Sequence, residues 1–208
     1  MTIIYIIVGL VILWSLWGYF SSRVERTEYS VIKPKGDSVY EIRNYPKHIV
    51  AQTVVKGPYR EALNQGFRIV AGYIFGGNAS REKIAMTSPV VENTSKGQAI
   101  AMTSPVTASM EGEMHTIAFG MPRSYTLETL PIPTDNRVKL ATIPERKMAV
   151  IRFSWFRSDS RVSAKKSALL GALQKDGLTT VGEPYYAGYN APWTPPWMNR
   201  NEVLVEVK

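Results

Sequence analysis

Side chains able to do acid–base or metal chemistry are few in this chain of 208 residues, which has two histidines, His48 and His115, and no cysteine. The lack of cysteine excludes disulfides, thiolate metal sites and a cysteine nucleophile. A zinc site built from histidines alone is also excluded, because such a site needs at least three imidazoles. The sequence contains no phosphate-binding loop, no H-E-x-x-H motif and no nucleophile elbow. An enzyme is therefore the least favoured class of function.

A repeated heptapeptide, IAMTSPV, occupies residues 84–90 and again residues 100–106. Each copy contains a proline that cannot donate to a strand ladder, and a turn signal that includes Gly97 separates the copies. The Thr and Ser hydroxyls suit local hydrogen bonds to the backbone. Methionines at Met86 and Met102 are more often core residues than thioether ligands. We therefore expect a structural hairpin here, not a catalytic device.

The first twenty residues carry no charged side chain, and Trp14, Trp17 and Tyr19 cluster near their end. A helix of about twenty apolar residues spans the hydrocarbon core of a bilayer, and aromatic side chains favour its interface. A cleaved signal peptide is disfavoured because a charged start and a small-residue cleavage site are missing; a buried core helix is the other alternative. We expect a single-pass membrane anchor over residues 1–22 and a linker over residues 23–37. Positive charge follows only on the C-terminal side, which favours a domain on the cytoplasmic face.

Residues 38–208 form one predicted domain in which the same order of elements occurs twice. Each half begins with two strand-like runs broken by a proline, Pro46 in the first half and Pro144 in the second, and continues with a helix and further strands. The second helix has a stop signal at Gly177. The predicted inward faces of the helices are Leu63, Phe67, Val70 and Ile74 in the first and Val162, Leu169 and Leu173 in the second. This duplication of hairpin, helix and strands predicts an α+β domain with pseudo-twofold symmetry, whose antiparallel sheet carries both helices on one face and leaves a groove between the halves.

Five stretches of the domain together resemble the SOUL heme-binding proteins. They are YEIRNYP, EALNQGFRIVAGYIFGGN, KIAMTSPV, FGMPRSYTLETLPIPTDNRVKL and AGYNAPWTPPWMNRNEVLVEV, beginning at Tyr40, Glu61, Lys83, Phe119 and Ala187. The doubled IAMTSPV block is also similar to a form found in some members. The resemblance implies a distorted antiparallel barrel of two βαβ-type repeats, in agreement with the duplication. It further implies reversible binding of heme or another tetrapyrrole in a shallow apolar groove, although a fold alone does not establish a function.

In this family the groove usually lies along one face of the first helix and is closed by the loop before the last strand. The residues at those places are Asn64, Phe67, Arg68 and Ala71 on the helix and Trp193 and Trp197 in the loop. In a heme site of this kind the tryptophans could stack on a porphyrin and Arg68 or Arg200 could meet a propionate. His48, just after the proline break, is the candidate axial ligand, and a solvated or hydrogen-bonded loop histidine is the commoner alternative. Some members carry Arg and Lys where Asn64 and Gly72 align, so this chain lacks two charge-assisted contacts. The alternative is that these aromatic residues only pack a proline-rich loop.

Three classes of function remain. The first is a membrane-anchored, non-catalytic protein that binds or carries a tetrapyrrole such as heme. The second is a binder or sensor of another small amphipathic ligand in the same groove, and the third is an enzyme. The net charge of +8 suits a domain held beside anionic headgroups, with solubility alone as the alternative. The basic residues form no stripe interleaved with aromatic residues, which argues against nucleic acid as a partner.

Overall fold

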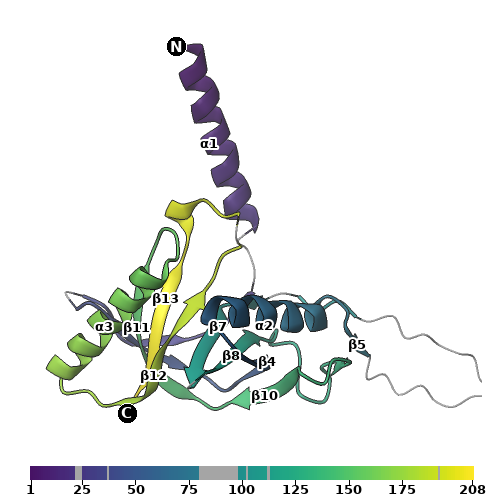
Figure 1. The fold of residues 1–208 in the computed structure, drawn as a ribbon. Coiled ribbons are helices and arrows are strands. Elements are labelled where there is room, and N and C mark those ends of the chain that lie inside the picture. The colour runs from purple at the N-terminus through teal and green to yellow at the C-terminus, as the bar shows by residue number, and fades with distance from the viewer. Residues whose placement is uncertain (22–24, 37, 80–97, 102, 112, 192) are drawn as a thin grey trace, which may run out of the picture.

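A projecting helix, a curled antiparallel sheet and two further long helices make up the structure, a computed structural model that describes residues 1–21, 25–36, 38–79, 98–101, 103–111, 113–191 and 193–208. The projecting helix, α1 (Thr2–Ser21), stands away from the sheet (Figure 1). Its stretch Thr2–Phe20 is long and apolar enough to cross a membrane, and only 6% of it is buried inside the protein. The protein itself therefore provides almost no core to cover this apolar helix.

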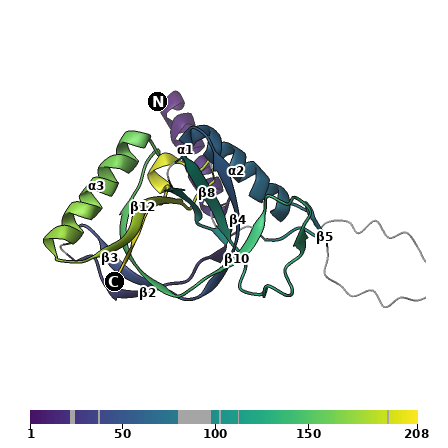
Figure 2. The ribbon, with the colours of Figure 1, turned by 60° about the horizontal axis from the view of Figure 1, so that its bottom comes forward.

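The central sheet contains nine strands among the described residues, in the order β10-β4-β8-β7-β12-β13-β11-β3-β2. The strands are β2 (Ser30–Lys33), β3 (Glu41–Tyr45), β4 (His48–Lys56), β7 (Val106–Glu111), β8 (Met114–Gly120), β10 (Lys139–Ile143), β11 (Arg146–Phe153), β12 (Thr180–Gly188) and β13 (Asn201–Val207). All neighbouring strands pair antiparallel. The sheet curls into a half-barrel with a concave and a convex face (Figure 2). Because successive side chains alternate between the faces, β4 sends Ala51 and Val55 to the convex core and Val50 and Gln52 to the concave side.

The pairing of the two proline-broken strand pairs differs from the predicted hairpins, which were wrong on this point. In each pair the two strands do not bond to one another; instead, β3 and β4 together run antiparallel to β10 and β11. The facing residues on either side of the bends are His48 with Ile143 and Tyr45 with Arg146. Neither Pro46 nor Pro144 lies in an Asn-Gly or Gly-rich turn of the kind that reverses a chain tightly, so each proline only bends its strand. As a result, β3 joins the second half of the sheet and β10 joins the first.

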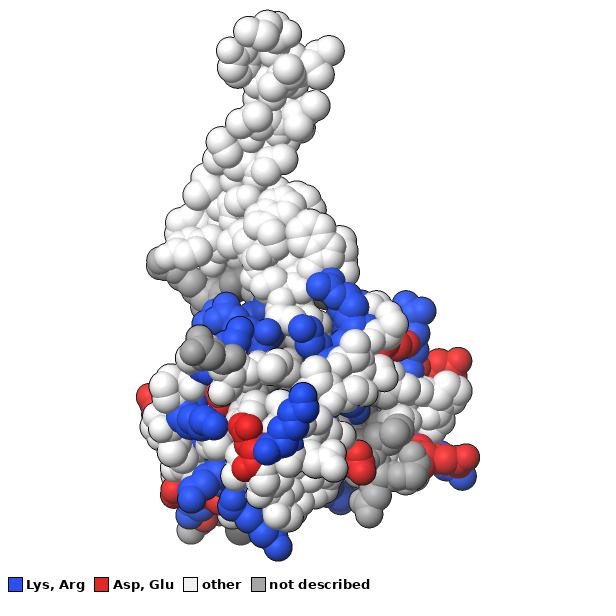
Figure 3. Space-filling view, turned by 90° about the vertical axis from the view of Figure 1, so that its left-hand side faces the viewer, with Lys and Arg blue, Asp and Glu red and all other residues white. Residues whose placement is uncertain are grey.

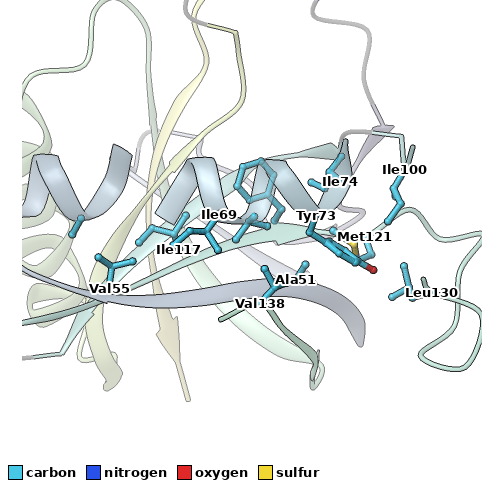
Figure 4. Packing of buried hydrophobic residues seen from close by; sticks show 13 residues of the cluster. Ala51, Val55, Ile69, Tyr73, Ile74, Ile100, Ile117, Met121, Leu130 and Val138 are labelled. Carbon is cyan, nitrogen blue, oxygen red and sulfur yellow. The ribbon is translucent and has the colours of Figure 1, made fainter. Parts of the chain in front are cut away.

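Both long helices of the domain cover the convex face. Helix α2 (Tyr59–Ile74) packs on β4 and β8, and α3 (Asp159–Lys175) packs on β11, β12 and β13. Figure 4 shows Ile69, Tyr73 and Ile74 of α2 lying against the sheet beside Ala51 and Ile117. These two helix–sheet contacts form the two convex cores of the domain.

The sequence-predicted helix faces are largely confirmed. Val162, Leu169 and Leu173 of α3 are all buried, as are Val70 and Ile74 of α2; Leu63 packs at the edge of its core, and Phe67 is partly exposed. The Ser158 hydroxyl accepts a hydrogen bond from the backbone N–H of Arg161 and caps the start of α3. Gly177 follows the end of α3 with φ of +69°, a left-handed conformation that favours glycine.

The predicted duplication is confirmed by the order of the sheet. The run β4-β8-β7 of the first half lies beside β12-β13-β11 of the second, with β10 and β3 as the exchanged flanking strands. The α+β class and the antiparallel sheet are therefore as predicted. The two halves meet along β7 and β12 on one side and along the proline bends on the other.

Several short elements complete the fold. The predicted linker contains β1 (Glu25–Arg26) as well as β2, and β1 pairs in parallel with β6 (Thr103–Ser104). Strand β5 (Asn78–Ala79) pairs with β9 (Ile132–Pro133), and a short 3-10 helix, η1 (Pro196–Met198), precedes β13. The first IAMTSPV copy lies outside the described residues, so the predicted hairpin between the copies stays a prediction. The second copy supplies the buried Ile100, strand β6 and the first residue of β7.

Candidate functional site

The concave face of the sheet holds a cavity of about 270 Å³ between the two halves of the domain, where the sequence predicts a groove. Its apolar lining includes Val50, Pro105, Ala118, Ile143 and Leu204, and its polar lining includes His48, Gln52, Arg146, Glu183, Tyr185 and Glu206. These side chains come from β4, β8, β10, β11, β12 and β13, with Pro105 just before β7. An apolar concavity with a few converging polar groups is the usual form of a small-molecule site.

Arg146 is the cation of this concave cavity. Its Nη2 donates a hydrogen bond of 3.0 Å to the Tyr185 hydroxyl, while its buried Nε has no hydrogen-bond partner in the described part of the chain. An unpaired buried donor costs about 1–3 kcal/mol, so a ligand that brings an acceptor to this donor relieves that cost, while Glu183 and Glu206 in the same lining oppose a negative charge. Burial raises the pKa of Tyr185 to about 12, against the opposing charge of Arg146. Tyr185 therefore remains a phenol and contributes a hydroxyl, not a negative charge.

His48 lies opposite Ile143 at the start of β4 and also lines the cavity. Its Nδ1 is 2.8 Å from the carbonyl oxygen of Pro46, so the tautomer that makes this bond donates from Nδ1 and leaves the Nε2 lone pair available. Burial lowers the pKa of His48 from its usual 6.5 and the charge of Arg146 lowers it further, while the bond to Pro46 opposes the shift. A neutral imidazole held by a backbone carbonyl is the form that binds a metal.

A buried charge network, which the sequence reasoning missed, lies on the same concave side beside the cavity. Glu202 of β13 is fully buried and accepts hydrogen bonds from Arg43 (2.8 and 3.0 Å), from Arg200 (2.8 Å) and from the Tyr189 hydroxyl (2.6 Å). Burial alone would raise the pKa of Glu202, but these hydrogen bonds and the two arginine charges lower it. The available signal was the spacing of two residues between Glu202 and Leu204 in β13, because it places a carboxylate on the same face of the strand as a buried apolar residue.

The predicted site residues on α2 lie on the other side of the sheet. Asn64, Phe67 and Arg68 are exposed on α2, whereas Ala71 is buried. The Phe67 ring is 39% exposed and contacts the ring of Phe119, with 5.3 Å between ring centroids. The α2 residues therefore form a convex surface patch, while His48 belongs to the concave cavity.

The predicted tryptophans lie in a third place, against α1. The Nε1 of Trp14 donates a hydrogen bond of 2.9 Å to the carbonyl oxygen of Trp193, and the rings of Trp14 and Trp197 lie edge to face with 5.4 Å between centroids.

The second histidine, His115, is buried, and its Nε2 is 2.9 Å from the carbonyl oxygen of Gly57. The structure thus separates the predicted helix face, the tryptophan loop and His48.

Comparisons with known proteins agree with the sequence motifs. A family model described as SOUL heme-binding protein matches residues 24–206. Heme-binding protein 2 of Homo sapiens is 29% identical over 164 residues, which cover 78% of this chain and 74% of that protein. Heme-binding protein 1 of Xenopus laevis is 25% identical over 185 residues, covering 86% and 90%. Among solved structures, the C-terminal domain of EcmrR has a TM-score of 0.56 at 10% identity over 86% of this chain and 98% of that one, a likeness of fold alone.

Proposed function

Because the chain belongs to the SOUL heme-binding protein family, we propose that it is a membrane-anchored, non-catalytic protein that binds heme or a related tetrapyrrole reversibly in the concave cavity. The observation that carries this proposal is that His48 and an incompletely bonded Arg146 line the same concave cavity. We infer a non-catalytic role because the sequence lacks recognised catalytic motifs. A binding or carrier role needs only the cavity and its polar groups.

The residues of the cavity fit the chemistry of a heme. His48 would hold the iron through its Nε2, because its Nδ1 is occupied by the Pro46 carbonyl. The free Nε donor of Arg146 and the Tyr185 hydroxyl suit a propionate carboxylate. The bound group would supply an iron centre for ligation. The protein would supply the ligand, the counter-charge and an apolar surface that excludes water.

The size of the cavity limits how a tetrapyrrole is held. At about 270 Å³ it lies just below the usual range of about 300–1,000 Å³ for ligand pockets, so it encloses only part of a large flat macrocycle. Partial enclosure favours reversible binding, as a carrier requires. The same volume also supports a second candidate, a smaller amphipathic carboxylate that enters the cavity completely and pairs with Arg146.

The convex patch on α2 is the alternative place for the ligand within the same proposed function. Phe67 offers an exposed ring there, and Arg68 offers an exposed cation one residue on. Trp193 and Trp197 contact α1. We favour the cavity because it combines a neutral imidazole with a half-buried cation that has an unused donor.

The membrane anchor of the proposal is α1. It is uncharged, projects from the domain and is almost wholly unburied (Figure 1). Such a helix gains most by crossing a bilayer. Positive charge follows the helix and not its start, so we propose that the domain faces the cytoplasm.

The test is a heme titration of the full-length protein in detergent, followed by the Soret absorbance and corrected with protein-free micelles. We expect a saturable one-to-one shift that His48→Ala weakens about tenfold or more and that Phe67→Ala leaves unchanged. The reverse pattern would move the site to α2 and contradict the cavity assignment. No saturable shift in the folded wild-type protein would refute tetrapyrrole binding and favour the smaller carboxylate, which calorimetry with an alkyl carboxylate would then detect.

The pH dependence of the same titration reports on His48. Its pKa is lowered below 6.5, so the imidazole is neutral at pH 7 and remains so until the pH falls through this lowered value. We expect heme affinity to be constant above neutrality and to fall in acid, because a proton competes with iron for the imidazole. An affinity that does not change in acid would exclude His48 as the ligand.

A further inference from the structure

Two loops beside α1 expose four large aromatic side chains. They connect β11 to α3 and β12 to β13, and the side chains, here termed the aromatic cap, are Trp155 (49% exposed), Phe156 (59%), Trp193 (57%) and Trp197 (43%). The loops are joined directly, because the backbone N–H of Trp155 donates to the carbonyl oxygen of Pro196 at 2.9 Å. Exposed aromatic residues gathered at one end of a domain indicate a surface that binds a membrane or another protein.

The aromatic cap is fixed to α1 well before the end of that helix. Besides the hydrogen bond and ring contact of Trp14, the backbone of Gly18 lies so close to Pro195 that an added Cβ would be 2.4 Å from the proline Cδ. Trp14 precedes Phe20 by six residues, or about 9 Å along a helix. Because α1 is apolar up to Phe20, a loop that contacts Trp14 lies alongside the apolar length of the helix, so a membrane-inserted α1 brings this loop against the bilayer surface.

The backbone around Trp155 holds this side chain in one exposed position. Trp155 has φ of +83°, a left-handed conformation that is strained for a bulky residue. Both of its backbone polar groups are engaged, the N–H by Pro196 and the carbonyl by the side-chain amide of Asn201 at 3.0 Å. The fold thus holds an exposed tryptophan in a strained conformation at the end of the domain nearest α1.

Basic side chains border the cap. Figure 3 shows Lys and Arg gathered in a band directly below the uncharged region formed by α1 and the adjoining loops. Arg161 donates to the Phe156 carbonyl at 3.2 Å, and Arg157 lies over the Tyr59 ring at 5.0 Å, which brings the neighbouring Arg60 of α2 to the same end. Arg157 is paired with Asp159, but neither Arg60 nor Arg161 has an ion-pair partner among the described residues. Arg60 and Arg161 form the basic collar.

From this arrangement we infer that the domain docks onto an anionic bilayer surface, with the aromatic cap inserted among the headgroups and the basic collar on the lipid phosphates. The inference rests on the proposed membrane anchoring by α1 and adds a fixed orientation to it. Aromatic rings above a bilayer core and arginines at the level of the phosphates match the layered polarity of the interface. The domain is therefore a peripheral membrane module held against the lipid, not one that moves freely on a tether.

The chain contains no cysteine, so single cysteines introduced for a fluorescent label report their own depth. We would reconstitute the full-length protein in phosphatidylcholine vesicles, with and without phosphatidylglycerol, and measure quenching of an environment-sensitive dye by nitroxide lipids. The labelled variants are Ile6→Cys in α1, Phe156→Cys in the cap and Lys208→Cys at the C-terminus, which lies at the opposite end of the molecule from α1 (Figure 1). Retained far- and near-ultraviolet circular dichroism would show that each variant is folded.

We expect quenching at positions 6 and 156 and none at Lys208. Quenching at position 6 without quenching at position 156 would overturn the docking inference and leave the anchor intact, whereas no quenching at position 6 would overturn both. The charge component is tested with Arg60→Gln in the Phe156→Cys background. Losing one interfacial charge should lower the ratio of docked to undocked domain about fivefold in vesicles with phosphatidylglycerol and leave it unchanged without it; equal docking in both lipids and both variants would refute the role of the collar.

Discussion

Substitution of Glu202 by glutamine should destabilise the domain strongly, although it changes only one atom of the side chain. The carboxylate accepts four hydrogen bonds and balances two arginines, Arg43 and Arg200, which are 1% and 8% exposed. A glutamine has one acceptor oxygen, and its amide N–H₂ group would face the arginine donors. Removing one partner from a buried ion pair costs about 3–5 kcal/mol, because the remaining charge is left buried. Here Arg200 loses its carboxylate, and Arg43 keeps only the partly exposed Glu41.

Thermal unfolding of the full-length protein in detergent, followed by circular dichroism, measures this cost. A loss of about 3–5 kcal/mol in a chain of this size lowers Tm by about 6–20 °C. The matched control is Glu113→Gln, which breaks an exposed ion pair with Lys56 (3.2 Å) and should change stability by about 1 kcal/mol or less. Equal Tm changes for the two variants would refute the reasoning, because the argument depends on the burial of Glu202.

The same comparison has a defined pH dependence. The pKa of Glu202 is lowered from 4.5, so the ionised carboxylate contributes stability that is fully present above pH 4.5 and is lost as the pH falls through the lowered value. The Tm difference between the wild-type protein and Glu202→Gln should therefore be constant near neutrality and should narrow in acid. A difference that widens in acid would mean that the folded-state pKa is raised instead.

Two further pairs of variants test the packing of the convex helices by urea or thermal unfolding in the same detergent. Gly66→Ala should cost about 1–3 kcal/mol, because the new Cβ would lie 2.5–3.0 Å from three atoms of Ile117. Gly72→Ala in the same helix meets no atom within 4 Å and should stabilise by about 0.5–1 kcal/mol; the same sign for both would contradict the close approach of α2 to β8. Leu169→Ala should cost about 2–5 kcal/mol and its neighbour Leu170→Ala, which is 37% exposed, about 0.5 kcal/mol, and equal losses would argue against the buried face of α3.

Local signals in the sequence were sufficient for the helices and for the extent of most strands. The spacing of Val162, Leu169 and Leu173 identified the buried face of α3, and Gly177 marked its end. These features depend on periods of 3.6 or 2 residues and on backbone preferences, which neighbouring residues determine. The family and the possibility of heme as ligand were likewise accessible from motif order along the chain.

Partnerships between distant segments could not be obtained in the same way. The proline bends at Pro46 and Pro144 can be recognised in the sequence. The sequence does not show that the two bent strands pair with each other across the two halves. Likewise, Trp193 looked like part of a groove beside α2, whereas the structure brings it to Trp14, far away in the chain. Strand pairing and loop docking depend on the total apolar area that all contacts of the fold bury together. Local patterns in one sequence do not specify this total.

The sequence by itself therefore determined an uncharged first helix, a duplicated α+β domain and membership of a family, because each of these depends on composition, periodicity or motif order. The tertiary structure alone decided that His48 and Arg146 share one concave cavity, that Glu202 is enclosed by two arginines, and that the tryptophan loop rests on α1. The physical reason is that burial and charge pairing involve residues from different strands and loops. These residues lie within a few ångströms of one another in space, although many positions separate them in the chain.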